Sequence, residues 1–363
     1  MISQKLKDKI LEYEGWNEEN KKLHPEIIEI IEEEKLFKLF LPSSLQGLNW
    51  PLHKIIDCLE EIAILDANVA WVINLIAGAN MFAGYFNPSL LEKINMQSNF
   101  AFAGSGAISG KAFKTKKGYK VEGYWKYASG AAHANYFTAN CWLYDEDAEI
   151  ILDSSGKPLF TSFIFDRKEV QVLDTWETLG LRASSSHDFK IENVEVPKYQ
   201  TFDLTKASTW SNAAIMSFPF ATLAVINMSA MIIGIAKGFL KEWENTILHK
   251  IPLNASEKIE NQAYSFQAYT KVKEQFQQEH DKTKKILEEV WIEQKKNGSV
   301  RDENLKLIEN QYQKCNGTCY DLVTTLYPLA GMNVVFQKNR LNKIFRDFMT
   351  ATQHYLVHPQ NRK

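Results

Sequence analysis

The chain has 363 residues, of which 45% are hydrophobic, 24% charged and 12% aromatic, and its formal net charge at pH 7 is -2. These proportions are typical of globular proteins and exclude collagen-like, disordered and low-complexity classes. A net charge near zero gives no general attraction to nucleic acids or anionic membranes, so we expect a small-molecule ligand. The length predicts two or three domains, because single cores stop growing at about 250–300 residues.

The first part of the chain, residues 1–95, is expected to form an N-terminal helical domain. Pro25 stands at a first-turn position ahead of apolar pairs at helical spacing. Two further apolar helices are predicted over Pro51–Asp66 and Val69–Tyr85.

Residues 96–205 change to an alternating pattern, which predicts a middle β domain. Runs such as Lys120–Tyr127, Tyr136–Tyr144 and Phe189–Val196 are separated by Gly, Asp and Ser clusters at hairpin-like intervals. Because no helical crossover separates these runs, we expect an antiparallel barrel or sandwich.

The helical period returns in residues 206–363. Short breaks separate four long amphipathic segments, which are Ala213–Leu248, Ser256–Lys296, Arg301–Tyr327 and Gly331–Val357. Four such segments predict a C-terminal four-helix bundle. The whole chain is therefore expected to have an α+β fold in the order helices, sheet, helices.

The cysteines, the start of the chain and the longest apolar runs bear on metal binding and on the cellular location. Cys315 and Cys319 lie four residues apart without the further ligands that zinc needs, so we expect no metal site. The charged start does not resemble a signal peptide, and the runs Val69–Ala79 and Ala221–Ala236 are expected to be too short or too polar to span a bilayer. A cytoplasmic location is therefore expected.

Two short motifs resemble known sites but lack the required context. Gly104-Ser-Gly-Ala-Ile-Ser-Gly110 has its third glycine one place late and continues into an alternating run, so we expect no dinucleotide site. Ser186-His187-Asp188 has the letters of a hydrolase triad, but consecutive side chains cannot form its relay. A turn at the start of a strand is expected there.

Two longer segments, Gly118–His133 and Trp176–Pro197, are more informative. Each combines a large aromatic residue with small residues and hydroxyl groups. This mixture suits a planar heteroaromatic cofactor, which needs an apolar face and hydrogen bonds at its edge. A β core with tight turns explains the same residues, so the residues alone leave both interpretations open.

Both segments and the order of elements resemble the acyl-CoA dehydrogenase superfamily over nearly the whole chain. The similarity is greatest to its flavin-dependent monooxygenase branch, such as the oxygenase component of 4-hydroxyphenylacetate hydroxylase. The matching stretches are Gly118-Tyr-Lys-Val-Glu-Gly-Tyr-Trp125-Lys-Tyr-Ala-Ser129-Gly130, Trp176-Glu-Thr-Leu-Gly-Leu-Arg182-Ala-Ser184-Ser-Ser-His187, and the C-terminal Leu329-Ala-Gly331, Arg346-Asp347 and Gln353-His354.

The resemblance implies a site for FMN or FAD between the β domain and the bundle. Ser129 is expected to donate a hydrogen bond near the N5/C4a edge of the flavin, and His354 to act as a base. The expected cofactor-binding residues are Trp125, Tyr127, Ser129, Gly130, Trp176, Arg182, Ser184 and Gly331, and the expected substrate-binding residues are Trp71 and His133. Roles as a helix-surface histidine, a turn hydroxyl and a core tryptophan remain open for His354, Ser129 and Trp71.

The C-terminal motif distinguishes two activities of the superfamily. Many of its dehydrogenases have a catalytic glutamate eight residues after the Arg-Asp pair, whereas this chain has Tyr355 there and no glutamate after Glu309. His354 stands where the hydroxylase branch has a histidine. The resemblance therefore implies the homotetrameric oxygenase component of a two-component monooxygenase, which uses O2 and reduced flavin from a separate reductase to hydroxylate a small aromatic or amine substrate.

Two alternatives remain open. One is an acyl-CoA dehydrogenase that oxidises an acyl thioester with FAD, which requires a carboxylate base from another helix. The other is a non-catalytic homologue that has lost flavin. The distribution of arginines suggests the homologue without flavin. No arginine occurs between residues 183 and 300, where the family often has phosphate-binding arginines.

Overall fold

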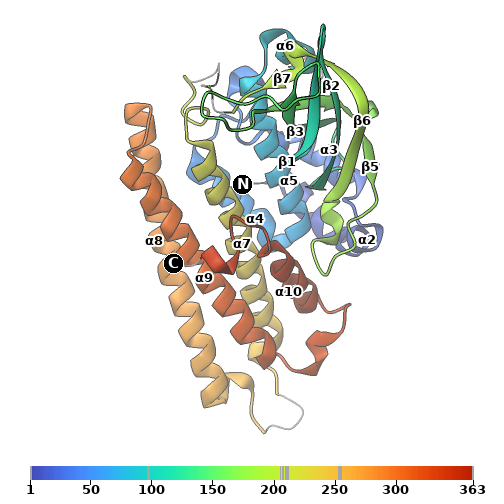
Figure 1. Cartoon of the computed structure of the whole chain (residues 1–363). Helices are drawn as coiled ribbons and strands as arrows, with labels where there is room; N and C mark the ends of the chain where they lie inside the picture. The colour runs from blue at the N-terminus through green and yellow to red at the C-terminus, as the bar shows by residue number, and fades with distance from the viewer. Residues whose placement is uncertain are drawn as a thin grey trace.

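The computed structural model describes residues 2–95, 99–204, 206, 208, 212–251 and 256–361. In chain order it has helices, a sheet and again helices, which confirms the predicted α+β fold (Figure 1). The expected domain boundaries at 95/96 and 205/206 adjoin residues 96–98 and 205, which lie outside the described residues.

The N-terminal part consists of helices of which α4 and α5 form the interior. They are α1 (Gln4–Glu12), α2 (Glu14–Asn20), α3 (Pro25–Glu33), α4 (Leu52–Leu65), α5 (Ala67–Asn80) and α6 (Pro88–Asn95). Helix α5 begins after Asp66 because its carboxylate accepts hydrogen bonds from the backbone N–H groups of Asn68 (2.8 Å) and Val69 (3.0 Å). Most of α5 is buried, and it carries Trp71 into the interior.

The middle part forms one seven-stranded sheet with the order β5-β6-β2-β1-β3-β4-β7. The strands are β1 (Phe102–Thr115), β2 (Gly118–Ala128), β3 (Tyr136–Tyr144), β4 (Phe160–Asp166), β5 (Gln171–Leu173), β6 (His187–Pro197) and β7 (Thr201–Phe202). The expectation of purely antiparallel pairing was wrong, because β1 and β3 are parallel. Strand β2 turns back along one edge of β1, and the chain then crosses to the other edge of β1 in the original direction. The expected strand start at Ser186-His187-Asp188 is confirmed.

The C-terminal part consists of α7 (Phe220–Trp243), α8 (Ala263–Asn297), α9 (Asp302–Leu329) and α10 (Arg340–Ala351). Helix α7 packs between α4 and α9, and α8 packs along α9 (Figure 1). The last expected segment, Gly331–Val357, was too long, because its first part is a 3-10 turn and a loop. The side chain of Asn339 then caps α10, which packs against α7.

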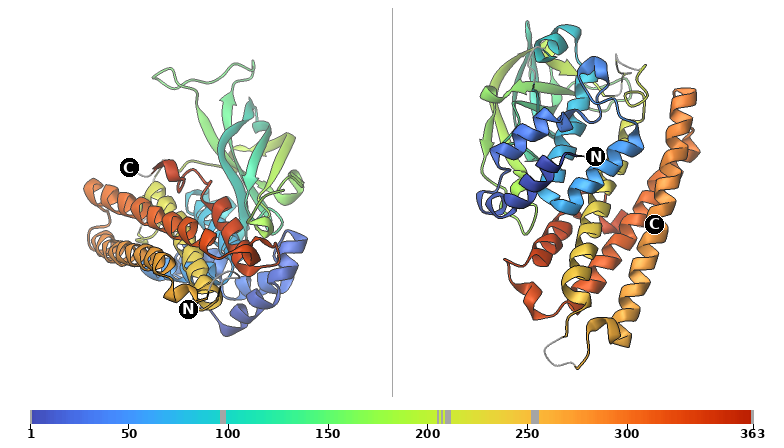
Figure 2. Two further views of the ribbon diagram at one scale, coloured as in Figure 1. Left: turned by 90° about the horizontal axis from the view of Figure 1, so that it is seen from below. Right: turned by 180° about the vertical axis from the view of Figure 1, so that it is seen from behind.

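The other views show the sheet on one side of the helices, with the segment between β3 and β4 projecting away from them (Figure 2). Ile150 and Leu152 in this projecting segment are exposed.

Two helical stretches, Ala67–Tyr85 and Phe220–Leu248, are long and apolar enough to cross a membrane. The expectation that these regions are too short or too polar was therefore wrong. Within the fold, 78% and 83% of their most apolar windows are buried, as in core helices of globular proteins.

Candidate functional site

The ends of two distant segments meet next to α5. The backbone N–H of Gly130, just after β2, donates to the carbonyl oxygen of Ser184 over 2.9 Å, and that of Ala131 donates to Ser185 over 3.2 Å. The two segments that resemble flavin-binding motifs therefore form one unit. Gly130 has φ +76°, a conformation that favours glycine, and a Cβ there would crowd Ile76 on α5.

Hydroxyl groups line this junction. The Ser129 Oγ lies 3.0 Å from the indole nitrogen of Trp71 and 2.8 Å from the Ser186 Oγ, which in turn lies 2.8 Å from the Ser184 Oγ. Ser184 and Ser186 are buried, whereas Ser129 is partly exposed. Ser129 is therefore the member of this chain of hydroxyls that a ligand can reach.

His354, just beyond α10, lies edge-on to Trp71 with ring centroids 6.1 Å apart. Burial lowers the pKa of His354 to about 4, so the imidazole is neutral at physiological pH. Its Nδ1 accepts a long hydrogen bond from the backbone N–H of Leu356 (3.4 Å), which assigns the proton of the neutral ring to Nε2. In this arrangement the Nε2 of His354 is a hydrogen-bond donor.

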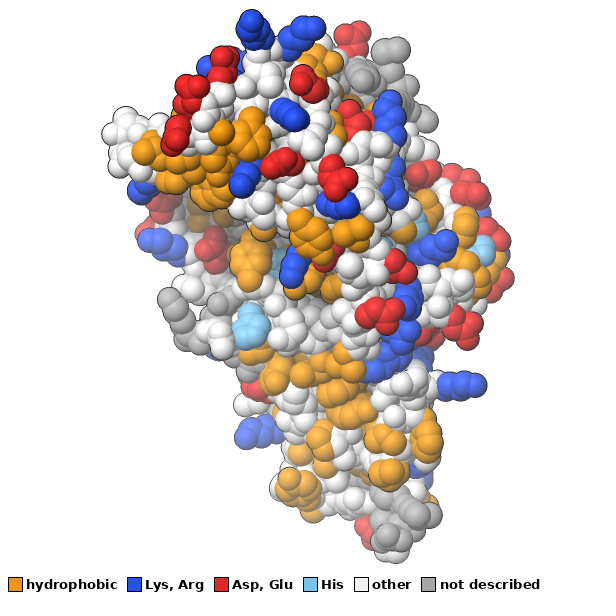
Figure 3. Space-filling view, turned by 45° about the vertical axis from the view of Figure 1, so that its right-hand side comes forward, with side chains coloured by type: hydrophobic (Ala, Val, Ile, Leu, Met, Phe, Trp, Pro, Cys, Tyr) orange, Lys and Arg blue, Asp and Glu red, His pale blue; other side chains and the backbone are white. Residues whose placement is uncertain are grey.

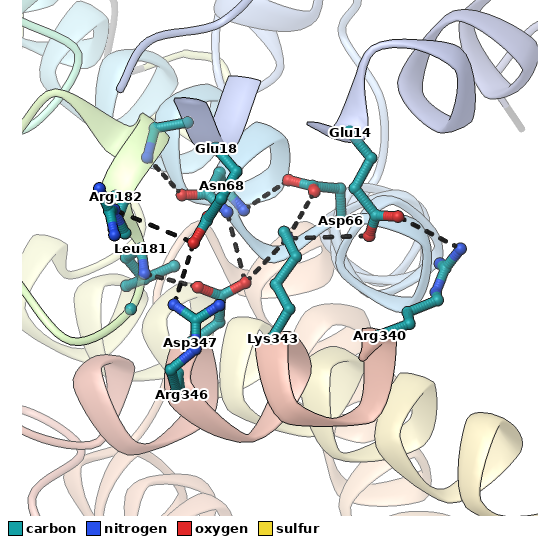
Figure 4. A network of polar contacts seen from close by, with 12 residues as sticks. Glu14, Glu18, Asp66, Asn68, Leu181, Arg182, Arg340, Lys343, Arg346 and Asp347 are labelled. Carbon is teal, nitrogen blue, oxygen red and sulfur yellow. Dashed lines mark hydrogen bonds and ion pairs between the residues drawn. The ribbon is translucent and has the colours of Figure 1, made fainter. Parts of the chain in front are cut away.

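A buried polar network fixes the turn that carries Ser184 and Ser186 (Figure 4). The Asp347 carboxylate on α10 accepts the backbone N–H of Leu181 over 2.6 Å, and the Asn68 side-chain oxygen accepts that of Ala183 over 2.8 Å. The Asn68 amide nitrogen donates to Asp347 over 3.3 Å. Leu181 has φ +51°, an unfavourable conformation for leucine that neighbouring groups must hold in place.

Lys343 provides the positive charge of this network. Its ammonium lies 2.9 Å from Asp66 and 3.0 Å from Asp347. Burial opposes the ionisation of Asp66, but Lys343 and backbone N–H groups outweigh it and lower the pKa of that carboxyl. For Asp347 burial dominates and raises the pKa despite Lys343. One ammonium thus serves two buried carboxylates, and it joins the start of α5 to α10.

Arg346 joins α10 to the same turn. Its guanidinium donates to the Glu18 carboxylate (2.9 Å) and to the carbonyl oxygen of Leu179 (2.8 Å). The next residue, Gly180, has no space for a side chain, because a Cβ would overlap the backbone of Arg346. The Arg-Asp pair that the sequence singled out therefore holds the 179–183 turn.

Sequence reasoning missed the partners of that pair, which are Asn68, Asp66 and Lys343. Two signals were available. Asp66 stands ahead of an apolar helix, as an N-cap does, and Lys343 and Asp347 have the i, i+4 spacing of a helical ion pair. Only the folded structure shows that Asp66 and the pair of Lys343 and Asp347 belong to one network.

Among the expected cofactor-binding residues, Trp125 lies in the core of the sheet domain. Its ring is fully buried in the core of the sheet domain, stacked on Phe189 with centroids 5.2 Å apart, and its indole N–H donates to the carbonyl oxygen of Asn140. Its period along β2 directs the ring into the sheet core, and its role as a wall for the cofactor stays a prediction. Ser184 is also fully buried, and its hydroxyl is connected to that of Ser129 through Ser186.

Tyr127 and Trp176 lie at the surface near Ser129. Tyr127 is 65% exposed and lies edge-on to Trp176, which is half-buried and donates its indole N–H to the carbonyl oxygen of Leu181 (2.8 Å). The Arg182 guanidinium is partly exposed and 3.9 Å from Glu18, a carboxylate that it shares with Arg346.

His133 and Gly331 contact other parts of the molecule. The Nε2 of His133 accepts the backbone N–H of Leu23 (3.3 Å), and burial lowers the pKa of this histidine to about 4. His133 therefore contacts the segment between α2 and α3, and its place in the substrate pocket stays a prediction. Gly331 lies in the exposed turn after α9 and has φ +77°.

Comparisons with known proteins agree with this architecture. Residues 226–359 match the model of the family described as "Acyl-CoA dehydrogenase, C-terminal domain". The chain is 22% identical to an indole-3-acetate monooxygenase of Acinetobacter baumannii over 91% of this chain and 82% of that protein. It is 21% identical to the oxygenase component of p-hydroxyphenylacetate 3-hydroxylase, also of Acinetobacter baumannii, over 93% of this chain and 81% of that protein.

The fold is also that of a solved flavoprotein. The structure of XiaF from Streptomyces in complex with FADH2 and glycerol superposes with a TM-score of 0.86 at 16% identity, covering 98% of this chain and 90% of that one. The predicted resemblance is thereby confirmed. The chain has the acyl-CoA dehydrogenase fold and is similar to the flavin-dependent monooxygenases of that superfamily over nearly its whole length.

Proposed function

We propose that the chain is the oxygenase component of a two-component monooxygenase, which takes reduced flavin from a separate reductase and hydroxylates a small aromatic or amine substrate with O2. One observation carries the proposal. Trp71, Ser129 and His354, which come from the helical start, the sheet and the C-terminal end of the chain, meet at one partly exposed place. The relatives and the FADH2 complex with the same fold support it.

The residues at this place fit a flavin. Ser129 offers a partly exposed hydroxyl, Tyr127 and Trp176 offer accessible ring surface, and Arg182 offers a partly exposed cation. A bound flavin would supply the activation of oxygen, which no amino-acid side chain performs. The residues of the chain would hold the ring edge, exclude water and orient the substrate.

We propose that His354 is the group that orients the substrate. A neutral ring with its proton on Nε2 donates a hydrogen bond to a phenol oxygen or to another acceptor on the substrate. To act as a base it would have to release the backbone N–H from Nδ1, or exchange its tautomer. The low pKa keeps the ring uncharged in either case.

The dehydrogenase alternative requires a carboxylate directed at the site. In the part of the chain that the structure describes, the two buried carboxylates of the adjoining network, Asp66 and Asp347, are held by Lys343 and by backbone N–H groups. Neither is available as a base for an acyl thioester. The alternative of a homologue without flavin is decided by measuring flavin binding.

The protein is also proposed to be a cytoplasmic homotetramer that accepts FMN or FAD. Hydrophobic side chains gather on the lower, helical part of the face in Figure 3, where charged side chains are sparse. Met332 and Phe336, in the loop between α9 and α10, are 75% and 64% exposed. Exposed apolar surface of this kind suits packing against other copies of the chain.

The test is product formation. The purified chain, supplied with NADH, a flavin reductase, FMN or FAD, and in separate assays indole, a simple phenol or a simple amine, is expected to form an oxygenated product only when O2 is present. His354→Ala is expected to lower the yield at least tenfold while flavin binding persists. His358→Ala is the matched control, because His358 also accepts a backbone N–H two residues ahead. No product from the unaltered chain with any phenol, indole or amine tested would contradict the proposal.

A further inference from the structure

The chain of serine hydroxyls leads from the interior to the partly exposed Ser129. Consecutive Oγ atoms, from Ser184 to Ser186 and from Ser186 to Ser129, are 2.8 Å apart. The indole nitrogen of Trp71 can only donate, so Ser129 must accept that hydrogen bond. Each hydroxyl has one proton to donate and two lone pairs that can accept.

Only one direction of donation satisfies the buried protons. Among the described residues, the hydroxyl of Ser184 has Ser186 as its hydrogen-bond partner, and Ser184 has no exposed surface. Its proton must therefore go to Ser186, and the proton of Ser186 must go to Ser129. If Ser129 donated to Ser186 and Ser186 donated to Ser184, the proton of Ser184 would be buried without an acceptor. If Ser184 and Ser129 both donated to Ser186, the proton of Ser186 would be buried without an acceptor. Both are strongly unfavourable.

Ser129 then accepts two hydrogen bonds, from Trp71 and from Ser186, and its own proton points to the open side of the site. We propose that Ser186 and Ser184 are positioning residues that make Ser129 a hydrogen-bond donor toward the ligand. This inference rests on the proposed function only for the identity of the ligand. A donor at this point recognises an acceptor atom, such as an unprotonated ring nitrogen or a carbonyl oxygen at the edge of a planar heteroaromatic ring.

The direction of donation can be measured without a ligand. The Trp71 indole N–H, identified among the nine tryptophans with Trp71→Phe, is followed in a proton–nitrogen NMR spectrum of the full chain. An oxygen that accepts a second hydrogen bond is a weaker acceptor, whereas one that donates is a stronger acceptor. Ser186→Ala is therefore expected to strengthen the bond from Trp71 and to move its proton signal downfield. Ser184→Ala is expected to give a smaller shift of the same sign.

Ser185→Ala is the matched control. Its hydroxyl is equally buried in the same turn but donates to the carbonyl oxygen of Lys21, outside the chain of hydroxyls. This variant is expected to leave the Trp71 signal in place. An upfield shift in Ser186→Ala, or equal shifts in Ser185→Ala and Ser186→Ala, would overturn the proposal.

A second measurement connects the hydroxyls to the ligand. Oxidised FMN is titrated into each variant, and Ser186→Ala is expected to bind it about fivefold more weakly than Ser185→Ala, as for the loss of one hydrogen bond. Equal affinities would contradict the positioning role. If the unaltered chain binds neither FMN nor FAD, the proposed function fails, while the NMR result still decides the direction of donation.

Discussion

At the scale of single residues, three members of the proposed site, Trp71, Ser129 and His354, are uncharged at neutral pH. Ser129 presents a hydroxyl and His354 a neutral imidazole, while the indole N–H of Trp71 donates to Ser129. Such a set binds a ring by direction and shape and leaves the redox chemistry to a cofactor. Sequence reasoning proposed all three residues through the resemblance, but it could not show that the ring of Trp125 packs on Phe189 in the core of the sheet domain.

Two histidines with lowered pKa values predict a dependence of stability on pH. The pKa values of His133 and His354 are lowered to about 4 in the folded chain, against about 6.5 when unfolded. The unfolded chain therefore binds more protons between these values. The free energy of unfolding is expected to fall as the pH drops from 6.5 toward 4, by up to about 1.4 kcal/mol per pH unit for each histidine. Urea unfolding at several pH values measures this slope.

The double variant His133→Gln, His354→Gln separates these two groups from the carboxylates, which also titrate in acid. It is expected to have a clearly shallower slope between pH 6.5 and 5, where carboxylates contribute little. If the free energy of unfolding of this variant depends on pH as steeply as that of the unaltered chain, these histidines are not the source of the pH dependence.

At the scale of elements, α10 supports the 179–183 turn next to the proposed site. It provides Lys343, Arg346 and Asp347, which connect the start of α5 to the 179–183 turn. The helical periods of α5 and of the α10 region could be predicted from the sequence, although the expected last segment began at Gly331, ahead of the observed start of α10 at Arg340. The contact between α5 and α10 could not be predicted. The hydrogen bond between Asn68 and Asp347 joins residues far apart in the chain, and no local sequence pattern specifies it.

Removing the one ammonium of this network should destabilise the fold. Lys343→Met leaves the carboxylates of Asp66 and Asp347 buried without their partner. The free energy of unfolding is expected to fall by about 3–5 kcal/mol, as for other buried ion pairs that lose one member. Lys5→Met is the control, because the ion pair of Lys5 with Glu33 is exposed and contributes little. Equal effects of the two substitutions in urea unfolding would contradict the role given to Lys343.

The close approach of α10 to the turn gives a second prediction at this scale. Gly180→Ala forces a methyl group against the backbone of Arg346 and is expected to lower the unfolding free energy by about 1–3 kcal/mol. Gly15→Ala, in α2 with open space around the new methyl, is expected to be neutral or stabilising. If thermal unfolding shows Gly180→Ala to be as stable as Gly15→Ala, the turn is not packed on α10 as described.

At the scale of the whole molecule, the order of helices, sheet and helices followed from the changes of hydrophobic period near residues 95 and 205. The parallel pairing of β1 with β3 did not, because alternation specifies which face of a strand is buried and not which strand lies beside it. The burial of the two most apolar helices could not be predicted either, because a core helix and a membrane helix can have the same length and composition.

The exposed apolar surface leads to a prediction about assembly. Light scattering coupled to gel filtration is expected to give about four times the mass of one chain. Replacing Met332 and Phe336 by serine is expected to shift the population toward smaller species, whereas Leu11→Ser, at an isolated exposed leucine of α1, is expected to leave it unchanged. A monomer for the unaltered chain would contradict this assembly.

The central claim is that the junction of Trp71, Ser129 and His354 is a flavin site. Anaerobic titration of the purified chain with reduced FMN and reduced FAD, followed by calorimetry, tests it most directly. We expect saturable binding of at least one of them in the micromolar range, weakened about fivefold or more in Ser129→Ala and unchanged in a variant of the distant Lys5. Absence of binding by the unaltered chain, or equal binding by Ser129→Ala, would contradict the account.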